Sequence, residues 1–272
     1  MKKGSLIIIL VLIGLFGCHD KTPHQATEPV NPKAPTLTYY LKDSFPHDTS
    51  LFTEGFLVHN GMIFESTGSP EEFSATRSVI GLQDLKTGNL AIKIELDKNK
   101  YFGEGIAILK NKLYQLTYKN QQGFIYDANT FKKLRDFHYS NLEGWGLTTD
   151  GKELIMSDGT DLLTFLNPET LRPVKILKVT ENGAPVINLN EMEFIKGYIY
   201  ANIWTTNFIM KIDPSNGIVV GKLDFNRLAA QQKSENINAQ EMNGIAYDSA
   251  ANKVYVTGKL WSKIYQVQIN QP

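Results

Sequence analysis

The stretch Gly105-Ile-Ala-Ile-Leu-Lys-Asn111-Lys-Leu-Tyr114 consists of two short apolar runs joined by a polar turn. Apolar runs on both sides of such a turn are typical of a β-hairpin. The tightest hairpin turns require positive φ angles, which Asn and Gly adopt at little cost. The stretch therefore predicts two antiparallel strands of an all-β protein.

The same plan occurs at five places in the chain. The turn residues are Gly61, Asn111, Gly151, Gly197 and Asn252, which follow one another at intervals of about 40 to 55 residues. In four of the five units a third apolar run follows, and its turn begins at Asp84, Asp127, Asn167 or Asp213. A short fourth strand is expected after each of these turns, for example over residues 89–96 and 174–179. Four strands repeated at this interval are typical of a β-propeller blade.

The repeats predict an all-β, five-bladed β-propeller over residues 36–272. The last unit ends near residue 269 and lacks a fourth strand of its own, so we expect the N-terminal strand over residues 37–41 to complete it. Ring closure of this kind joins both ends of the chain and removes an exposed sheet edge. A β-sandwich with irregular hairpins is the alternative, which the regular spacing of the turns disfavours.

The composition is that of a globular protein. Of the 272 residues, 42% are hydrophobic and 21% are charged. The 28 basic and 28 acidic residues give a formal net charge of zero, which offers no reason to expect a nucleic-acid partner. The single cysteine excludes an internal disulfide and a cysteine-rich metal site.

The amino terminus has the pattern of an export signal. Two lysines precede an apolar run over residues 6–16, which is too short to span a bilayer, because a spanning helix needs about 20 residues. The run ends just before Cys18, as in bacterial lipoproteins; a plain signal peptide with an incidental cysteine is the alternative. We expect a signal peptide over residues 1–17, a lipid anchor on Cys18 and a proline-rich tether over residues 18–35. The protein would then be an exported lipoprotein that is anchored to the membrane and faces the periplasm.

The propeller register places two sets of residues at one mouth of the central channel. The first strand of each blade lines the channel, so residues at the start of these strands converge on the axis. The residues directly before the expected first strands are Glu54, Glu104, Trp145, Asn190 and Asn243. The residues at the ends of the second strands, which return to the same level, are Gly68, Tyr118, Asp158, Trp204 and Lys259.

This mouth has the composition of a site for a small molecule or a peptide end, with apolar walls and a few polar groups. A carboxylate that Trp and Tyr rings desolvate would have a raised pKa and would suit acid–base chemistry. A lysine opposite it would stabilise a carbonyl oxygen or a developing oxyanion. For any single residue, a structural role at the channel is the alternative. His47, His59 and His138 have no metal-ligand spacing, so we expect no metal. The sequence also has no glycine-rich phosphate loop, and we expect no cofactor.

Short motifs carry a resemblance to a known family. They are Phe52-Thr-Glu-Gly55, Glu65-Ser-Thr-Gly68, Tyr101-Phe-Gly-Glu-Gly105, Glu143-Gly-Trp-Gly-Leu147, Leu189-Asn-Glu-Met-Glu193, Ala201-Asn-Ile-Trp204, Asn243-Gly-Ile-Ala246 and Val256-Thr-Gly-Lys-Leu-Trp261. With these motifs in this order, and over nearly all of residues 38–270, the sequence resembles the plant and bacterial type of glutaminyl-peptide cyclotransferase. Members of that family are five-bladed propellers.

The resemblance implies conversion of an N-terminal glutamine to pyroglutamate with release of ammonia. It implies that Glu104 is the general acid and base, and that Lys259 and Asn190 hold the amide oxygen and the substrate backbone. It also implies a set of substrate-binding residues, namely Phe52, Glu54, Tyr118, Trp145, Trp204 and Asn243. The partners would be peptides or proteins with an N-terminal glutamine, and the enzyme would be a monomer without a cofactor.

Glu54 and Tyr118 depart from the family pattern, which has glutamine and tryptophan at these positions. A carboxylate at position 54 would bind the substrate ammonium more strongly or raise the pKa of Glu104 by like-charge repulsion. Two other functions remain open from the sequence alone. One is a non-catalytic propeller that binds peptides or envelope proteins, and the other is a propeller hydrolase or lactonase that uses metals in the channel.

Overall fold

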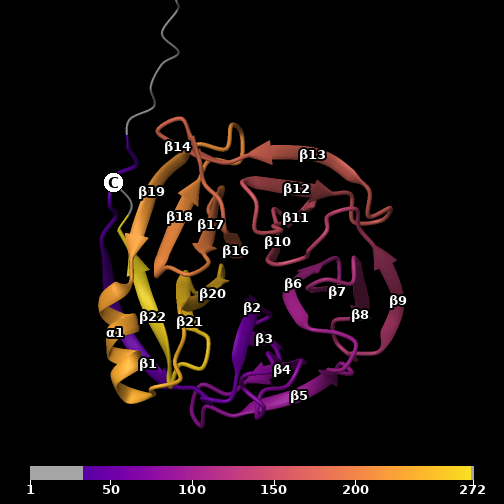
Figure 1. The fold of residues 1–272 in the computed structure, drawn as a ribbon, viewed down its shortest axis with the longest axis horizontal. Helices are drawn as coiled ribbons and strands as arrows, with labels where there is room; N and C mark the ends of the chain where they lie inside the picture. The colour runs from indigo at the N-terminus through magenta and orange to yellow at the C-terminus, as the bar shows by residue number, and fades with distance from the viewer. Residues whose placement is uncertain (1–32, 271–272) are drawn as a thin grey trace, which may run out of the picture. The chain divides into compact units, whose positions relative to one another are not determined.

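The computed structural model describes residues 33–270. The expected signal peptide, the anchor at Cys18 and most of the tether lie outside the described residues. The described part of the chain forms five four-stranded antiparallel sheets around a common centre (Figure 1). The predicted five-bladed β-propeller is therefore confirmed. Within residues 33–270, no helix has the length and apolar character needed to cross a membrane.

Each blade runs from an inner strand to an outer strand. Blade 1 contains β2 (Phe52–His59), β3 (Met62–Gly68), β4 (Val79–Gln83) and β5 (Leu90–Glu95). Blade 2 contains β6 (Gly103–Leu109), β7 (Lys112–Thr117), β8 (Gln122–Asp127) and β9 (Lys133–His138). Blade 3 contains β10 (Leu147–Thr149), β11 (Leu154–Met156), β12 (Leu162–Leu166) and β13 (Pro173–Lys178). Blade 4 contains β16 (Leu189–Ile195), β17 (Tyr198–Ile203), β18 (Phe208–Ile212) and β19 (Val219–Asp224).

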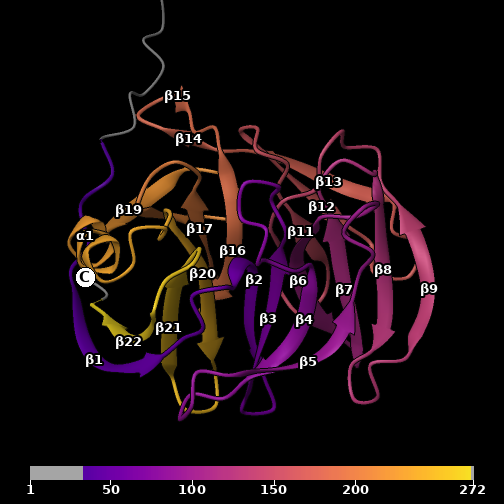
Figure 2. The same ribbon diagram turned by 60° about the horizontal axis from the view of Figure 1, so that its bottom comes forward.

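Blade 5 is the blade that closes the ring. It contains β20 (Met242–Asp248), β21 (Lys253–Gly258) and β22 (Lys263–Ile269), and its outer strand is β1 (Tyr39–Pro46) from the other end of the chain (Figure 2). The closure by the N-terminal strand is thus confirmed, although the strand lies over Tyr39–Pro46 rather than residues 37–41. The difference arises because the chain first pairs with β19, where Thr36 forms a bridge with Lys222.

The hairpin turns have the backbone that their sequences predict. Gly61, Asn111, Gly151, Gly197 and Asn252 all have positive φ angles. In blades 1, 2 and 4 the preceding turn residue has a positive φ angle as well. Two consecutive positive φ angles give the turn a twist that matches the twist of the flanking strands.

The apolar core is divided among the interfaces between neighbouring blades. Five buried clusters are present in the described residues, and each joins two adjacent blades. The smallest lies at the seam between blades 5 and 1, where the ring closes, and consists of Phe56, Ile63, Ala246, Tyr255 and Ile264. The inner strands contact one another in the order β2, β6, β10, β16, β20 and back to β2. Their starting ends therefore meet at the axis, as the site prediction requires.

Two small elements were not expected from the sequence. The hairpin of β14 (Thr180–Glu181) and β15 (Ala184–Pro185) lies between blades 3 and 4, and helix α1 (Asn226–Glu235) lies between blades 4 and 5. The buried residues of α1 are Leu228 and the polar Gln232. Gln232 accepts a hydrogen bond from the Ser262 backbone N–H at 2.6 Å and donates one to the Tyr265 hydroxyl at 2.9 Å. Leu228 and Ala229 also pack against the apolar cluster of blades 4 and 5, but two adjacent apolar residues do not give a helical period in the sequence.

The third turn of blade 4, between β18 and β19, offers a test of the packing between blades. The equivalent turn position has a positive φ angle at Phe131, Leu171 and Gly217, so this backbone accepts a side chain in two other blades. At Gly217, however, a Cβ atom would collide with the backbone carbonyl oxygen of Lys178. We expect Gly217→Ala to lower the free energy of unfolding by about 2–3 kcal/mol in urea denaturation. Gly151→Ala is the control, since its φ is 88° and a Cβ would have no atom within 4 Å. Equal losses in the two variants would contradict the expected collision.

Candidate active site

A cavity of about 690 Å³ opens at the end of the blades where the inner strands begin. Eight of its lining residues are ones that the sequence singled out, namely Phe52, Glu54, Glu104, Tyr118, Trp145, Asn190, Trp204 and Lys259. Loop residues 69–72 and 98–102 form further parts of the wall. Pockets of about 300 to 1,000 Å³ are the size that holds small molecules and peptide ends. Seven of the ten register positions therefore meet in one place.

The inner strands are irregular at the positions of the polar site residues. In blades 1, 2, 4 and 5 the pairing of the first two strands skips residues, and the skipped positions include Glu54, Glu104, Asn190 and Asn243. These strands also begin two or three residues earlier than predicted, so the four residues lie within them, whereas Trp145 precedes β10. Irregularities of this kind re-aim side chains and are frequent next to active sites.

Lys259 lies between two carboxylates at the floor of the cavity. Its Nζ is 3.0 Å from Oε1 of Glu54 and 3.3 Å from Oε1 of Glu241, and it stands 4.7 Å from the ring centre of Phe52. Burial alone lowers the pKa of Lys259, but the charges of the nearby carboxylates outweigh this effect and raise it. Lys259 is therefore a fixed positive charge at neutral pH.

Glu54 and Glu104 are both buried and both hold their protons more strongly than a free carboxylic acid. Burial raises the pKa of Glu54 to about 7, against the opposing effect of Lys259. Burial also raises the pKa of Glu104 well above its ordinary value, and the like charges of Glu54 and Glu143 add to the increase. A carboxyl group with a raised pKa is suited to proton transfer near neutral pH.

Aromatic rings form a continuous wall along blades 1 to 4. Centroid distances between successive rings are 6.3 Å for Phe52–Phe102, 5.8 Å for Phe102–Tyr118, 6.5 Å for Tyr118–Trp145 and 5.4 Å for Trp145–Trp204. The indole N–H of Trp145 donates a hydrogen bond to Glu143 at 2.9 Å, which fixes the orientation of that ring. The wall supplies the apolar surface against which a glutamine side chain would fold.

Three residues predicted for this mouth have other places. Asn243 is fully buried and does not line the cavity. Its Nδ2 donates a hydrogen bond to Oε2 of Glu54 at 2.9 Å. Asn243 therefore orients the Glu54 carboxylate, which lines the cavity. Gly68 provides room for Phe102, since a Cβ there would collide with the ring. Asp158 accepts hydrogen bonds from the Asn141 side chain at 2.8 Å and from the Thr160 backbone N–H at 3.1 Å, and it does not line the cavity.

The register prediction missed three residues of the site. They are Phe102, which lines the cavity, Glu143, which orients Trp145, and Glu241, which pairs with Lys259. Each lies two positions before a residue that the register does identify. All three lie outside the first strands, in the segments that lead into them, so extending the register by two positions toward the amino terminus would have included all three.

Asn190 has a buried side-chain oxygen without a hydrogen-bond partner within residues 33–270. Buried polar atoms are almost always satisfied, so an N–H group of a bound ligand fits at this oxygen. In the same part of the chain, no group of three or more His, Cys, Asp or Glu residues is arranged to hold a metal ion.

Comparison with known proteins agrees with this geometry. The family model described as glutamine cyclotransferase matches residues 10–269. A glutaminyl-peptide cyclotransferase of Arabidopsis thaliana is 39% identical over 229 residues, which cover 84% of this chain and 70% of that protein. The crystal structure of Myxococcus xanthus glutaminyl cyclase matches with a TM-score of 0.78 and 32% identity, over 88% of this chain and 99% of that chain. The chain therefore belongs to the glutamine cyclotransferase family.

Proposed function

We propose that the protein converts the N-terminal glutamine of peptides and proteins to pyroglutamate and releases ammonia. The observation that carries the proposal is the meeting of Glu104, Lys259 and Asn190 in one cavity with an aromatic wall. Membership of the family, and the names of both relatives, support the same reaction. A non-catalytic peptide-binding propeller would not require a buried acid, a lysine and an unpartnered amide oxygen to face the same cavity.

The first task of the site is to fold the substrate onto itself. The attacking α-amine and the side-chain amide belong to the same residue, so holding them in contact removes most of the entropic barrier. Trp145 and Trp204 meet edge to face at 5.4 Å and present an apolar surface for the folded side chain. The open side of the cavity leaves room for the rest of the peptide.

The second task is to move one proton. The α-amino nitrogen forms a bond to the amide carbon, while the carbonyl electrons move onto the oxygen. Glu104, as the carboxylate, accepts the proton that the attacking nitrogen loses. The protonated Glu104 then returns this proton to the amide nitrogen as the carbon–nitrogen bond breaks. Ammonia leaves, the five-membered lactam remains, and Glu104 is a carboxylate again.

The third task is to stabilise charge. The Lys259 ammonium would hold the amide oxygen as it becomes negative, which is the role that fixed positive groups play for oxyanions. The unpartnered oxygen of Asn190 would accept a hydrogen bond from a substrate N–H. The Glu54 carboxylate would attract the substrate ammonium. All of these residues come from one chain, and we propose that the monomer is sufficient for activity.

The test is to incubate a peptide that begins with glutamine and to follow it by mass spectrometry together with ammonia release. We expect loss of ammonia from the peptide and its appearance in solution in equal amounts. The matched control is the same peptide with an acetylated amino terminus, which lacks the attacking nitrogen. Saturable binding of the free peptide without pyroglutamate would identify a non-catalytic propeller instead.

Replacing Glu54 with glutamine is expected to move the acidic limb of the pH profile of kcat/KM to lower pH. The Glu54 charge raises the pKa of Glu104, and the neutral amide does not. Glu104 would therefore become a carboxylate at a lower pH in the variant. The measurement is kcat/KM from pH 5 to 9 for both proteins. An acidic limb that stays in place would show that Glu54 does not act on the proton-transferring group.

We propose also that the protein is exported and held at the membrane by a lipid on Cys18. The support is the apolar run that ends directly before this single cysteine. In a bacterial host, Cys18→Ser is expected to abolish incorporation of labelled fatty acid and to move the protein from the membrane fraction to the soluble fraction. Specific activity should be unchanged, because the residues that line the cavity all lie between Phe52 and Lys259. A serine variant that stays in the membrane fraction would contradict the anchor.

A further inference from the structure

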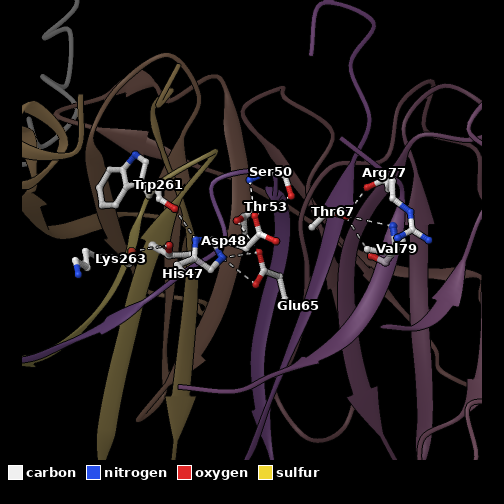
Figure 3. A network of polar contacts seen from close by, with 11 residues as sticks. His47, Asp48, Ser50, Thr53, Glu65, Thr67, Arg77, Val79, Trp261 and Lys263 are labelled. Carbon is white, nitrogen blue, oxygen red and sulfur yellow. Dashed lines mark hydrogen bonds and ion pairs between the residues drawn. The ribbon is translucent and has the colours of Figure 1, made fainter. Parts of the chain in front are cut away.

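A buried ion pair that the proposed reaction does not use lies at the seam between blades 5 and 1. His47 follows β1, and its Nε2 is 3.1 Å from both carboxylate oxygens of Glu65 on β3 (Figure 3). The side chains of both residues have 0% exposure. The other ring nitrogen, Nδ1, is 2.8 Å from the backbone oxygen of Trp261. Glu65 also accepts a hydrogen bond from the Thr53 hydroxyl at 2.8 Å.

The partners of the ring require that His47 be doubly protonated. The carbonyl oxygen of Trp261 and the carboxylate of Glu65 only accept hydrogen bonds, so both ring nitrogens must donate. Burial alone lowers the pKa of His47, but Glu65 and the bond to Trp261 outweigh it and raise the pKa, with a smaller contribution from Asp48 in the same loop. The ring thus faces a carboxylate on blade 1, an aspartate on its own loop and a neutral carbonyl after β21.

The pair connects the two chain segments that carry the site. Thr53 stands between Phe52 and Glu54, so Glu65 holds the segment that bears the first carboxylate of the cavity. Trp261 lies two residues after Lys259, so His47 holds the turn that bears the lysine. This turn contains Leu260 with a φ of 59°, a left-handed backbone that is unfavourable for a residue with a side chain. A strained turn keeps its geometry only where its surroundings hold it.

The pair lies between blades 5 and 1, the two blades that carry Lys259 and Glu54. The seam has the smallest of the five apolar clusters in the described residues, and the buried His47–Glu65 pair lies across it. The Glu54–Lys259 ion pair crosses the same seam. We propose that His47 and Glu65 are positioning residues that set Lys259 against Glu54 and thereby aim the lysine at the substrate amide oxygen. The proposal rests on the cyclotransferase function described above.

The kinetic test is His47→Gln, which removes the charge and one of the two ring contacts. We expect kcat to fall about 10- to 100-fold, the effect of a displacement near 1 Å at a reacting group, with KM changed less than about threefold. His138→Gln is the matched control, because His138 is exposed on an outer strand. If His47→Gln does not fold, Glu65→Gln, which is isosteric and uncharged, is measured in its place. A lower Tm with wild-type kcat in the folded protein would overturn the proposal.

A double-mutant cycle distinguishes positioning from a general loss of structure. In a Lys259→Met background the group to be positioned is absent, so adding His47→Gln should lower the remaining rate less than about twofold. If the two losses instead multiply, His47 does not act through Lys259 and the proposal fails. The wild-type rate in the same assay tests the cyclotransferase function by itself, so a failure of that function is recognised separately.

Nitrogen NMR of histidine-labelled protein tests the charge state without using activity. We expect His47 to carry protons on both nitrogens at pH 7, whereas His59, whose pKa burial lowers, should be neutral there. In Glu65→Gln the His47 signal should change to that of a neutral ring at pH 7. A neutral His47 in the wild-type protein at pH 7 would overturn the proposed pair.

Discussion

Replacing Glu104 with glutamine is expected to lower kcat for pyroglutamate formation by about 10²- to 10⁴-fold, the range for loss of a general acid and base. The amide has nearly the shape of the carboxyl group but neither accepts nor returns the proton that passes from the attacking to the leaving nitrogen. KM should change little, because the aromatic wall and Lys259 remain. The measurement is steady-state ammonia release at pH 7 and 25 °C.

The same substitution is expected to leave the protein as stable as before or more stable. Burial raises the pKa of Glu104 above its ordinary value of 4.5, so ionisation of this group opposes folding at pH values above 4.5. The glutamine variant lacks this unfavourable contribution, and its Tm at pH 7 should equal or exceed that of the wild type. The difference should vanish below pH 4.5, where the carboxyl group is protonated in both the folded and the unfolded state.

Glu193→Gln is the matched control for Glu104→Gln. Glu193 is a second acid of the inner strands, lines a separate cavity of about 160 Å³ and has a pKa that burial raises to about 8. It is therefore mostly protonated at pH 7, and an amide resembles its protonated form. Wild-type kcat is expected for this variant. Undiminished turnover in Glu104→Gln, or an equal loss in both variants, would remove Glu104 from the proton-transfer role.

The features of the fold that the sequence predicts are those that depend on local backbone chemistry. Positive φ angles at Gly61 and Asn111 follow from what a tight hairpin demands of its turn residues, and the repeat interval then determines the number of blades. The start of β1 could not be found in this way. It depends on a bridge between Thr36 and Lys222, two residues far apart in the chain. Helix α1 escaped prediction because it buries one leucine and one glutamine rather than an apolar stripe.

The site likewise contains residues that the propeller register predicts and residues whose positions depend on contacts between blades. Glu104 and Lys259 could be placed in one cavity because the propeller register brings equivalent positions together. Phe102 and Glu241 follow from the same register once it is extended by two positions. The buried position of Asn243 could not be predicted, since it depends on a hydrogen bond to Glu54 in the neighbouring blade. The His47–Glu65 pair likewise joins residues whose approach depends on ring closure.

Replacing Lys259 with methionine is expected to damage both activity and stability. The lysine is the group that would stabilise the oxyanion, and loss of such a donor lowers kcat by about 10²- to 10³-fold. Its removal also leaves the buried carboxylate of Glu54 and the less buried one of Glu241 without their cation. Breaking a buried ion pair by removing one partner costs about 3–5 kcal/mol. We therefore expect a lower Tm at pH 8, measured by calorimetry.

The pH dependence of the loss in Tm distinguishes the effect of Lys259→Met on stability from its effect on kcat. Glu54 has a pKa of about 7 beside the lysine, and its pKa must rise further when the positive charge is removed. As the pH falls through this raised pKa, Glu54 takes up a proton and the uncompensated charge disappears. The difference in Tm between variant and wild type should therefore be largest at high pH and shrink toward pH 5, while kcat stays low throughout. Lys259→Arg should recover more stability than activity, because it keeps the charge but not the compact ammonium geometry. If Lys259→Met lost stability but kept wild-type kcat, the lysine would be only a counterion for Glu54, and the oxyanion would need another donor.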